Sequence, residues 1–497
     1  MKTYLIIIMA LMPFAVSVGQ ESFKLAIKTP QPEIASGLIE LDNGNYIITG
    51  IRLNDNVSPD SKGMIWLVNA YGILIDSVEI SKQDTIVYLG KVQKYGNNYF
   101  IAATFAYYEN SDRRNFPVFF LVDSALNLLN EYRIPLDSNY SFIESMGTVL
   151  AGDELYIGGN ARNKNFTEYY TDLFICKYNL QTHVLQSNFL ALTGDQLSTG
   201  YLKTSNYNII FSVGLWGYPP DYSYGYYTLF DNDLNWIVTD SLPDDICLNN
   251  SSINLNDSTY LLSGRQSVFI APPSIDEERS VLYKMAFPNQ PINSYKYHMG
   301  TDTLSFPAGS SIDTTRTGEI YFSGTANVIP YQAPFQQDPS WIFLSKLDRD
   351  LNPIWTKLYG GDMFYQVYSV KATHDGGAIM ACITYDHRTQ DYEHDILIMK
   401  VNEDGLIVGT GEELSNISVQ DAIVYPNPGN EYFHIQSGPQ ISGALFELFD
   451  MNGNIVLTTI LDERVETMST IKLSTGTYPY RITFQNKIVG SGKWLKK

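Results

Sequence analysis

Apolar and polar residues form short alternating blocks along most of the chain, and each block fits a strand bounded by tight turns. The stretch HDGGAIMACITYDHRTQDYEHDILIMKVNEDGLIV, starting at His374, contains a turn, an apolar strand, a polar loop, a second apolar strand and another turn. The apolar runs are rich in Ile, Tyr, Phe, Val and Leu, residues that favour strands. Short continuous apolar runs of this kind are typical of sheets buried on both faces. The pattern predicts an all-β protein.

The same order of turn, strand, loop and strand recurs along the chain, which indicates an internal repeat. A small residue closes the first strand of each unit, at a spacing of about 50 to 60 residues, within the range of units that each form a four-stranded sheet. Seven such units predict a seven-bladed β-propeller over residues 20–410. The closing residues are Gly50, Ala103, Gly159, Gly214, Gly264, Gly324 and Cys382.

Two segments compete to complete the last unit of the ring. FKLAIKT, from Phe23, precedes the first unit in the position that IWTKLYG, from Ile354, occupies before the last. LIVGTG, from Leu406, is the alternative. We favour the N-terminal segment, which would join the two ends of the ring.

In this register the units resemble the DGG-type propeller repeats of secreted bacterial proteins. The unit from Trp355 to Val408 fits best, and units two, four and five are degenerate. The resemblance implies a fold and no particular activity.

A second region starts after a polar linker, residues 411–422. Four segments follow in order: VYPNPGNEYFHI, ALFELFDMNGNIVL, LSTGTYPYRITF and the terminal GKWLKK. Over residues 423–497 they resemble the type A C-terminal sorting domain of Bacteroidota type IX secretion substrates, although Pro479 interrupts one strand. The resemblance implies a small immunoglobulin-like β-sandwich that the secretion machinery binds. Its motif residues are Pro426, Asn427, Pro428, Asn452, Gly453, Gly476, Tyr478 and Lys493.

The N-terminus reads as an export signal. In MKTYLIIIMALMPFAVSVGQ, Lys2 precedes an apolar run from Leu5 to Val16, which is followed by small residues. This order predicts a signal peptide over residues 1–19, too short in its apolar part for a membrane anchor. We therefore expect a mature chain without a transmembrane span, secreted or at the cell surface.

The net charge and the cysteine content argue against several classes of partner and cofactor. The net charge of −20 disfavours nucleic acid and anionic membranes, and residues before 423 carry 26 Lys or Arg against 47 Asp or Glu. Aromatic residues make up 13 % of the chain, with 36 Tyr, which suits strands. The three cysteines, Cys176, Cys247 and Cys382, are too far apart to indicate a disulfide framework or a metal motif. We expect no cofactor.

Function is expected on the variable loops between the two apolar strands of each unit. The fourth loop, LWGYPPDYSYGYY, offers exposed aromatic rings that can stack on sugars or anchor a protein partner, or else pack on each other. Its candidate ligand-binding residues are Trp216, Tyr218, Tyr222 and Tyr224.

The seventh loop, YDHRTQDYEHD, contains imidazole and carboxylate groups of the types that bind zinc or calcium. A polar hairpin tip is the simpler interpretation, since no fixed metal motif is present. The weak metal candidates are Asp386, His387, Asp391 and His394.

Two classes of function fit these features. The first is a non-catalytic binding or adhesion module for extracellular glycan or protein. The second is an extracellular polysaccharide hydrolase or lyase, which would need two carboxylates near the mouth of the central channel. We favour binding, because no carboxylate pair can be named from the sequence.

Overall fold

A computed structural model of the protein gives the fold. It describes the following residues: 22–53, 61–109, 112–134, 140–163, 171–191, 195–215, 224–243, 248–268, 277–299, 303–329, 332–389, 393–407, 422–425, 429–437, 443–451, 453–462, 465–484 and 487–497. Within these ranges the chain contains no α-helix, and apart from one 3-10 turn, η1 (His387–Thr389), its regular elements are strands. The expected signal peptide lies outside the described residues.

The N-terminal half consists of four-stranded groups in which each strand pairs antiparallel with the next along the chain. The alternating turns and apolar runs of the sequence give this meander, because each turn reverses the chain onto the strand before it. The groups are β2 (Glu33–Glu40), β3 (Tyr46–Arg52), β4 (Lys62–Val68) and β5 (Leu74–Ile80); β6 (Ile86–Tyr95), β7 (Asn98–Glu109), β8 (Asp112–Val122) and β9 (Leu128–Arg133); β10 (Tyr140–Ala151), β11 (Glu154–Asn163), β12 (Asp172–Asn179) and β13 (Leu185–Leu190); and β14 (Asp195–Lys203), β15 (Tyr207–Leu215), β16 (Tyr224–Asp231) and β17 (Trp236–Ser241).

The same arrangement continues to residue 401. The later groups are β18 (Leu248–Asn254), β19 (Thr259–Val268), β20 (Glu277–Ala286) and β21 (Gln290–Tyr297); β22 (Ser305–Thr314), β23 (Ile320–Ala326), β24 (Trp341–Leu347) and β25 (Pro353–Gly360); and β26 (Phe364–Ala372), β27 (Ala378–Tyr385) and β28 (Asp395–Val401), completed by β1 (Phe23–Ile27).

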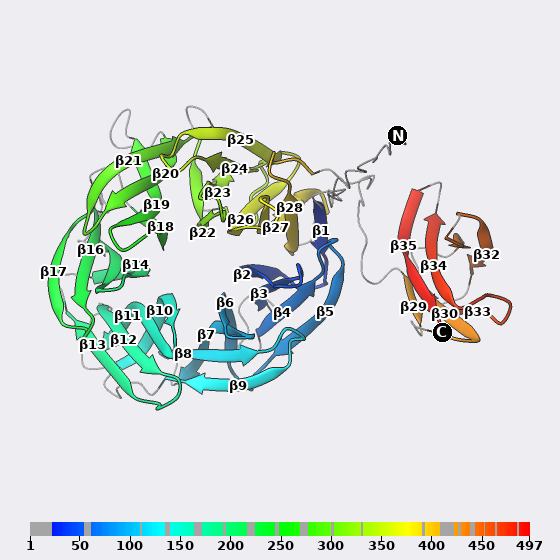
Figure 1. The fold of residues 1–497 in the computed structure, drawn as a ribbon, viewed down its shortest axis with the longest axis horizontal. Helices are drawn as coiled ribbons and strands as arrows, with labels where there is room; N and C mark the ends of the chain where they lie inside the picture. The colour runs from blue at the N-terminus through cyan, green and yellow to red at the C-terminus, as the bar shows by residue number, and fades with distance from the viewer. Residues whose placement is uncertain are drawn as a thin grey trace, which may run out of the picture.

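These groups are arranged in a ring around a central space, as Figure 1 shows. The first strand of each group, such as β2, β10 or β22, lies innermost, and the fourth, such as β9, β17 or β25, forms the rim. Radial sheets around a common axis are the arrangement of a β-propeller. The predicted all-β propeller architecture is therefore confirmed.

The N-terminal strand completes the last group. β1 pairs antiparallel with β28, in a register that runs from Phe23 opposite Lys400 to Ile27 opposite Ile396. Phe23 and Ile27 are buried in a cluster that also contains Trp66 of β4 and Ile398 of β28. The predicted closure by the N-terminal segment is confirmed, and Leu406, which begins the alternative segment, lies outside any strand.

Apolar clusters between neighbouring groups form the core. One cluster combines Ile47 and Ile65 of the first group with Val87, Ile101 and Phe120 of the second. Burying both faces of each sheet in this way explains why the apolar runs are nearly continuous. Cys176 and Cys382 are buried free thiols, and burial raises the pKa of both, so they act as small apolar side chains.

The C-terminal region forms two small sheets around its own core, which contains Phe433, Phe446 and Trp494. The strand β34 (Gly476–Phe484) runs through Pro479, which lies opposite Lys493, so the proline does not end the strand. Gly453 has a φ of +83°, as a tight turn needs, and Tyr478 donates a hydrogen bond of 2.7 Å to Ser474 O. The strands are β29 (Ala422–Tyr425), β30 (Tyr432–Ser437) and β33 (Val465–Ser469), and β31 (Ala444–Phe449), β32 (Ile455–Leu461), β34 (Gly476–Phe484) and β35 (Lys487–Lys496).

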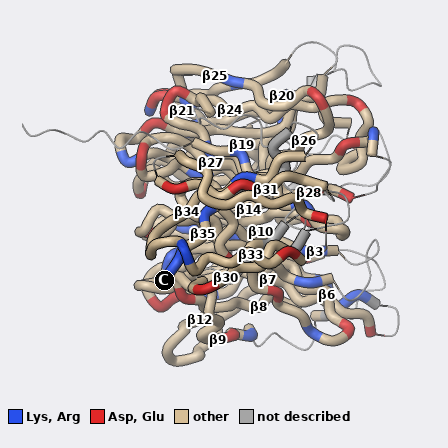
Figure 2. Tube along the Cα trace, turned by 90° about the vertical axis from the view of Figure 1, so that its right-hand side faces the viewer, with Lys and Arg blue, Asp and Glu red and all other residues tan. Residues whose placement is uncertain are grey.

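The remaining motif residues are placed as follows: Gly476 is the first residue of β34, whereas Pro426, Asn427, Pro428 and Asn452 lie outside the described residues. Figure 2 shows the Lys, Arg, Asp and Glu residues of the described chain scattered along a mostly uncharged trace, many of them at turns.

Candidate ligand site in the central cavity

An irregularity recurs at the same place in each innermost strand. A β-bulge interrupts its pairing with the second strand, so the residues inside the bulge have no partner across the ladder. Bulges can redirect a side chain out of the regular pleat, and they are frequent beside functional sites. The interruptions lie between Ala35 and Gly37, Leu89 and Val92, Ser145 and Gly147, Ser198 and Gly200, Asn249 and Ser251, Pro307 and Ile312, and Val367 and Ser369.

The small residues that mark the sequence repeat lie opposite these bulges. Gly50 pairs with Ala35, and a Cβ there would lie 2.1 Å from Ile34 O. Gly324 pairs with Pro307, and a Cβ there would lie 2.2 Å from Phe306 O. The close approach of the bulged backbone therefore requires glycine at both positions.

The fourth group differs slightly from this pattern. Its marker residue, Gly214, pairs with Gln196, two residues before the bulge, and Ser212 faces Ser198 at the bulge itself. The spacing of the sequence repeat is shifted there by two residues. In the remaining groups, the markers at the bulge are Ala103, Gly159, Gly264 and Cys382.

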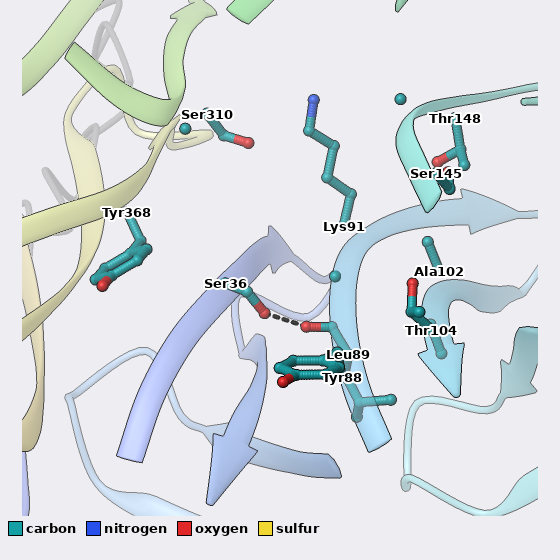
Figure 3. A pocket seen from close by; sticks show the side chains of 14 residues that line it. Ser36, Tyr88, Leu89, Lys91, Ala102, Thr104, Ser145, Thr148, Ser310 and Tyr368 are labelled. Atoms are coloured by element: carbon teal, nitrogen blue, oxygen red, sulfur yellow. Dashed lines mark hydrogen bonds between the residues drawn. The ribbon is translucent and has the colours of Figure 1, made fainter. Parts of the chain in front are cut away.

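The bulges of four strands meet around one cavity of about 300 Å³, seen from close by in Figure 3. Ser36, Lys91, Ser310 and Tyr368 come from the bulges of β2, β6, β22 and β26. Ligand pockets start at about this volume. The other lining residues are Tyr88, Leu89, Gly90, Ala102, Ala103, Thr104, Ser145, Gly147, Thr148 and Gly309, and none of these described lining residues carries a carboxylate.

Lys91 brings the only formal charge among the lining residues that the structure describes. Figure 3 shows its extended side chain between Ser310 and Thr148, with the ammonium group directed into the open space. The ring of strands around it removes hydration and, together with the positive charge of Lys371, lowers the pKa of Lys91 to about 8. The side chain nevertheless keeps exposed surface, because the cavity around it is open.

The backbone that carries Lys91 is fixed by hydroxyl groups of the first group. Ser36 Oγ donates a hydrogen bond to Leu89 O, and Thr49 Oγ1 donates one of 2.6 Å to Gly90 O. Both acceptors directly precede Lys91 in the chain, so the start of its side chain is held in place. On the far side of the cavity, burial raises the pKa of Tyr368 to about 12, so this phenol stays protonated at neutral pH.

The aromatic residues of the fourth loop are only partly placed. Trp216, Tyr218 and Tyr222 lie outside the described residues, and Tyr224 begins β16, opposite Gly214. The aromatic platform stays a prediction.

The metal candidates of the seventh loop are held by other contacts. Asp386 binds Arg388 through two contacts of 2.6 and 2.8 Å, which lower the pKa of this carboxyl. His394 is buried, stacks on Phe335 at 5.2 Å, and has Nδ1 3.2 Å from Glu33 O. In the described residues, no three His, Cys, Asp or Glu side chains converge as metal ligands.

The other two metal candidates are His387 and Asp391. His387 lies in η1, and its Nδ1 is buried without a hydrogen-bond partner among the described groups. Asp391 lies outside the described residues. A metal site in this loop therefore stays a prediction.

Sequence reasoning missed the central cavity. In LGKVQKY, Lys91 and Lys94 look like equivalent polar positions of one strand. The repeated small residues were the available signal, because they mark the bulges that direct side chains inward.

Residues 423–497 match the family model described as a secretion system C-terminal sorting domain. The predicted type IX sorting domain is confirmed by this match, and the domain implies an interaction with the type IX machinery. The protein is therefore exported, and it is secreted or located at the cell surface. Within the described residues, no helix has the length and apolar character needed to cross a membrane.

Comparison with solved structures finds similar folds at low sequence identity, among them a β-propeller domain. The β-propeller domain of the Trilobed protease from Pyrococcus furiosus is 9% identical over 74% of this chain and 96% of that chain, with a TM-score of 0.41. Drosophila Semaphorin 1b, extracellular domains 1–2, is 9% identical over 76% and 86% of the two chains, also with a TM-score of 0.41. No curated protein sequence matches the chain. Similarity at this level carries no information about activity.

Proposed function

We propose that this exported protein is a non-catalytic binding module whose seven-bladed propeller holds an extracellular glycan. The strand groups, each with a bulge in its innermost strand, support the blade number. A signal peptide over residues 1–19 and a type A, immunoglobulin-like sorting domain of a Bacteroidota protein complete the proposed export route. The proposed domains are the propeller over residues 20–410, a linker over 411–422 and the sorting domain over 423–497.

The composition of the central cavity carries this proposal. Glycoside hydrolysis normally requires two carboxyl groups roughly 5–9.5 Å apart, one acting as acid and one as nucleophile or base. The described lining of the cavity contains hydroxyl groups, two phenols and one ammonium group, but no carboxylate. These groups can hold a polar ligand by hydrogen bonds, yet they lack the acid and base pair of a hydrolase.

A sugar suits these groups better than a protein segment does. Ser36, Thr104, Thr148 and Ser310 offer hydroxyl groups around the cavity, and Tyr88 and Tyr368 offer ring faces on which a pyranose can stack. The aromatic residues Trp216, Tyr218, Tyr222 and Tyr224 would extend the sugar contacts onto the loop face. A protein partner at that face, and a metal ion in the seventh loop, are weaker proposals.

A glycan array with the full-length chain tests the proposal. We expect binding to at least one glycan class, no release of reducing sugar from the bound polysaccharide, and loss of binding when Ser310→Leu narrows the cavity. Leu128→Ala, on the exposed rim strand β9, is the matched control and should bind as the parent does. Release of oligosaccharide would favour the alternative, a polysaccharide hydrolase or lyase, and overturn the proposal.

A further inference from the structure

The ammonium group of Lys91 has no ion pair or hydrogen bond with any residue that the structure describes. Other lysines near it do have such partners. Lys94, three residues along the same strand, lies 2.6 Å from Asp42, and Lys371 lies 3.7 Å from Asp313. In a chain with 53 Asp and Glu residues, a lysine at the centre of the ring with no carboxylate partner among the described residues calls for an explanation.

We propose that Lys91 binds an oxyanion of the ligand, so that the sugar held in the central cavity is an acidic one bearing a carboxylate or a sulfate. This proposal rests on the cavity being the glycan site of the proposed function, and it adds the chemical class of the ligand.

Uncharged hydroxyl groups that can donate hydrogen bonds line the same cavity as the Lys91 ammonium group. Ser145 of β10 and Ser310 of β22 line the same cavity, and neither hydroxyl has a hydrogen-bond partner among the described residues. Thr148 Oγ1 accepts a 3.1 Å hydrogen bond from Gln93 Nε2, which leaves its own proton available. An oxyanion at Lys91 would therefore find an ammonium group and additional O–H donors, the combination that gives charge-assisted hydrogen bonds.

The site is also preorganised. The two hydrogen bonds from Ser36 and Thr49 fix the carbonyl groups just before Lys91. Gly37 approaches this bulge so closely that a Cβ would lie 2.4 Å from Gly90 O. Little backbone freedom is lost on binding, which favours affinity.

Attraction to the site is local. The propeller as a whole is acidic, so its field at long range repels anions. Binding has to come from the short-range contacts of the cavity, where reduced hydration strengthens each ionic contact. Because binding depends on short-range contacts, an acidic sugar that fills the cavity should bind more tightly than a simple counterion. The counterion makes no contacts with the hydroxyl groups.

Competitive acetylation of the full-length chain tests the proposal. A lysine with a lowered pKa reacts readily with acetic anhydride, and a bound oxyanion blocks it. At ten times the dissociation constant of galacturonate or glucose 6-sulfate, we expect acetylation of Lys91 to slow about tenfold. Neutral galactose should have no such effect, and Lys94, read in the same mass spectra, serves as the internal control. Lys91→Met should abolish binding of both acidic sugars in calorimetry, and Lys94→Met should not.

The outcomes separate this proposal from the proposed function. Equal protection by galactose would keep the cavity as a sugar site and overturn the oxyanion contact. Protection by sodium chloride at matched ionic strength would overturn it as well, since any counterion would then suffice. Binding on the glycan array without protection of Lys91 would refute only this inference. Protection by galacturonate without any binding on the array would refute the glycan function and the acidic glycan inferred from it, and would leave only a contact between Lys91 and a small oxyanion.

Discussion

At the scale of single residues, Lys91 makes the central cavity sensitive to pH. Its pKa of about 8 lies below the usual value of a free lysine, about 10.4, because the surrounding strands reduce the hydration of the ammonium group and the charge of Lys371 repels it. Between these two values the unfolded chain binds more protons than the folded one, so stability rises with pH in this window. Among the described lining residues, Tyr88 and Tyr368 are the other ionisable groups, and Lys371, whose charge acts on Lys91, lies 3.7 Å from Asp313.

Lys91→Met is therefore expected to raise the melting temperature at pH 7, where the parent carries the full cost of the charge. The difference should disappear near pH 10.5. Differential scanning fluorimetry at both pH values measures it. A lower melting temperature of the variant at pH 7 would show that the charged Lys91 side chain does not destabilise the fold. Oxyanion binding by the parent should weaken above pH 8, as Lys91 loses its proton.

Asp375 forms an ion pair with Lys400, and this pair also makes stability rise with pH, but in the acidic range. Burial alone would raise its pKa, but hydrogen bonds from Lys400 and Thr373 outweigh burial and lower the pKa of this carboxyl. A lowered pKa contributes stability above the unfolded value near 3.9, and that stability is lost as the pH falls through the folded value. Asp375 also accepts a hydrogen bond from Gly377 N in the turn before β27.

We expect Asp375→Asn to lower the free energy of unfolding at pH 7 by about 2 kcal/mol, because it leaves the buried Lys400 ammonium without its carboxylate. The loss should shrink toward pH 3, because the carboxyl of the unfolded parent is mostly protonated there and the ion pair then contributes less stability. Urea unfolding of the parent and the variant at pH 7 and pH 3 measures the loss in free energy of unfolding and its decrease at low pH. Asp386→Asn, which removes an exposed pair with Arg388, is the control, and its effect should stay below about 1 kcal/mol. Equal losses in free energy of unfolding for the two variants would refute the claim that the Asp375–Lys400 pair is more stabilising than the exposed Asp386–Arg388 pair.

At the scale of elements, one turn recurs between third and fourth strands. Asp123, Asp231 and Asp348 each accept backbone hydrogen bonds, 2.8–2.9 Å long, from the residues two and four positions ahead. The residue between these donors has a φ of 63–65° and is a buried leucine: Leu126, Leu234 or Leu351. Burial of the leucine in the core offsets a backbone conformation that costs about 1–2 kcal/mol.

In the last group a glycine takes the left-handed position of this turn. Gly405 has a φ of +69°, and a Cβ there would lie 2.7 Å from the Trp355 ring. Gly96, in the hairpin between β6 and β7, has a φ of +59° with open space around it. Gly96→Ala should therefore cost only the backbone term, about 1 kcal/mol, whereas Gly405→Ala should cost more. Equal losses in chemical denaturation would show that Trp355 moves aside freely.

These elements show which features a sequence can reveal. Gly50 and Gly324 were visible as repeat markers, because the bulged backbone opposite them leaves no room for a Cβ. The leucines with a left-handed backbone conformation could not be predicted, because leucine normally occurs in regular strands and helices. The cavity was also hidden, because Lys91, Ser145 and Ser310 are far apart in the chain and meet only when the ring closes.

At the scale of the whole molecule, closure of the ring depends on the short strand β1. Phe23 is 8% exposed, packs in the cluster shared by the first and last groups, and lies so close to Gly72 that a Cβ there would meet its ring at 2.4 Å. The Lys28 ammonium adds a contact of 3.2 Å to Asp395 at the start of β28. The two ends of the propeller are thus joined by backbone pairing, an aromatic side chain and an ion pair.

Because Phe23 stabilises the joint through buried apolar contacts, Phe23→Ala should lower the free energy of unfolding by about 3 kcal/mol. Leu128→Ala, on the exposed surface of β9, should change it by less than about 0.5 kcal/mol. Guanidinium unfolding of the full-length chain measures both. We also expect weaker ligand binding in the central cavity, because Ser36 of the first group and Tyr368 of the last group line it together only when the ring is closed. A Phe23→Ala variant with unchanged stability would show that the ring stays closed without this contact.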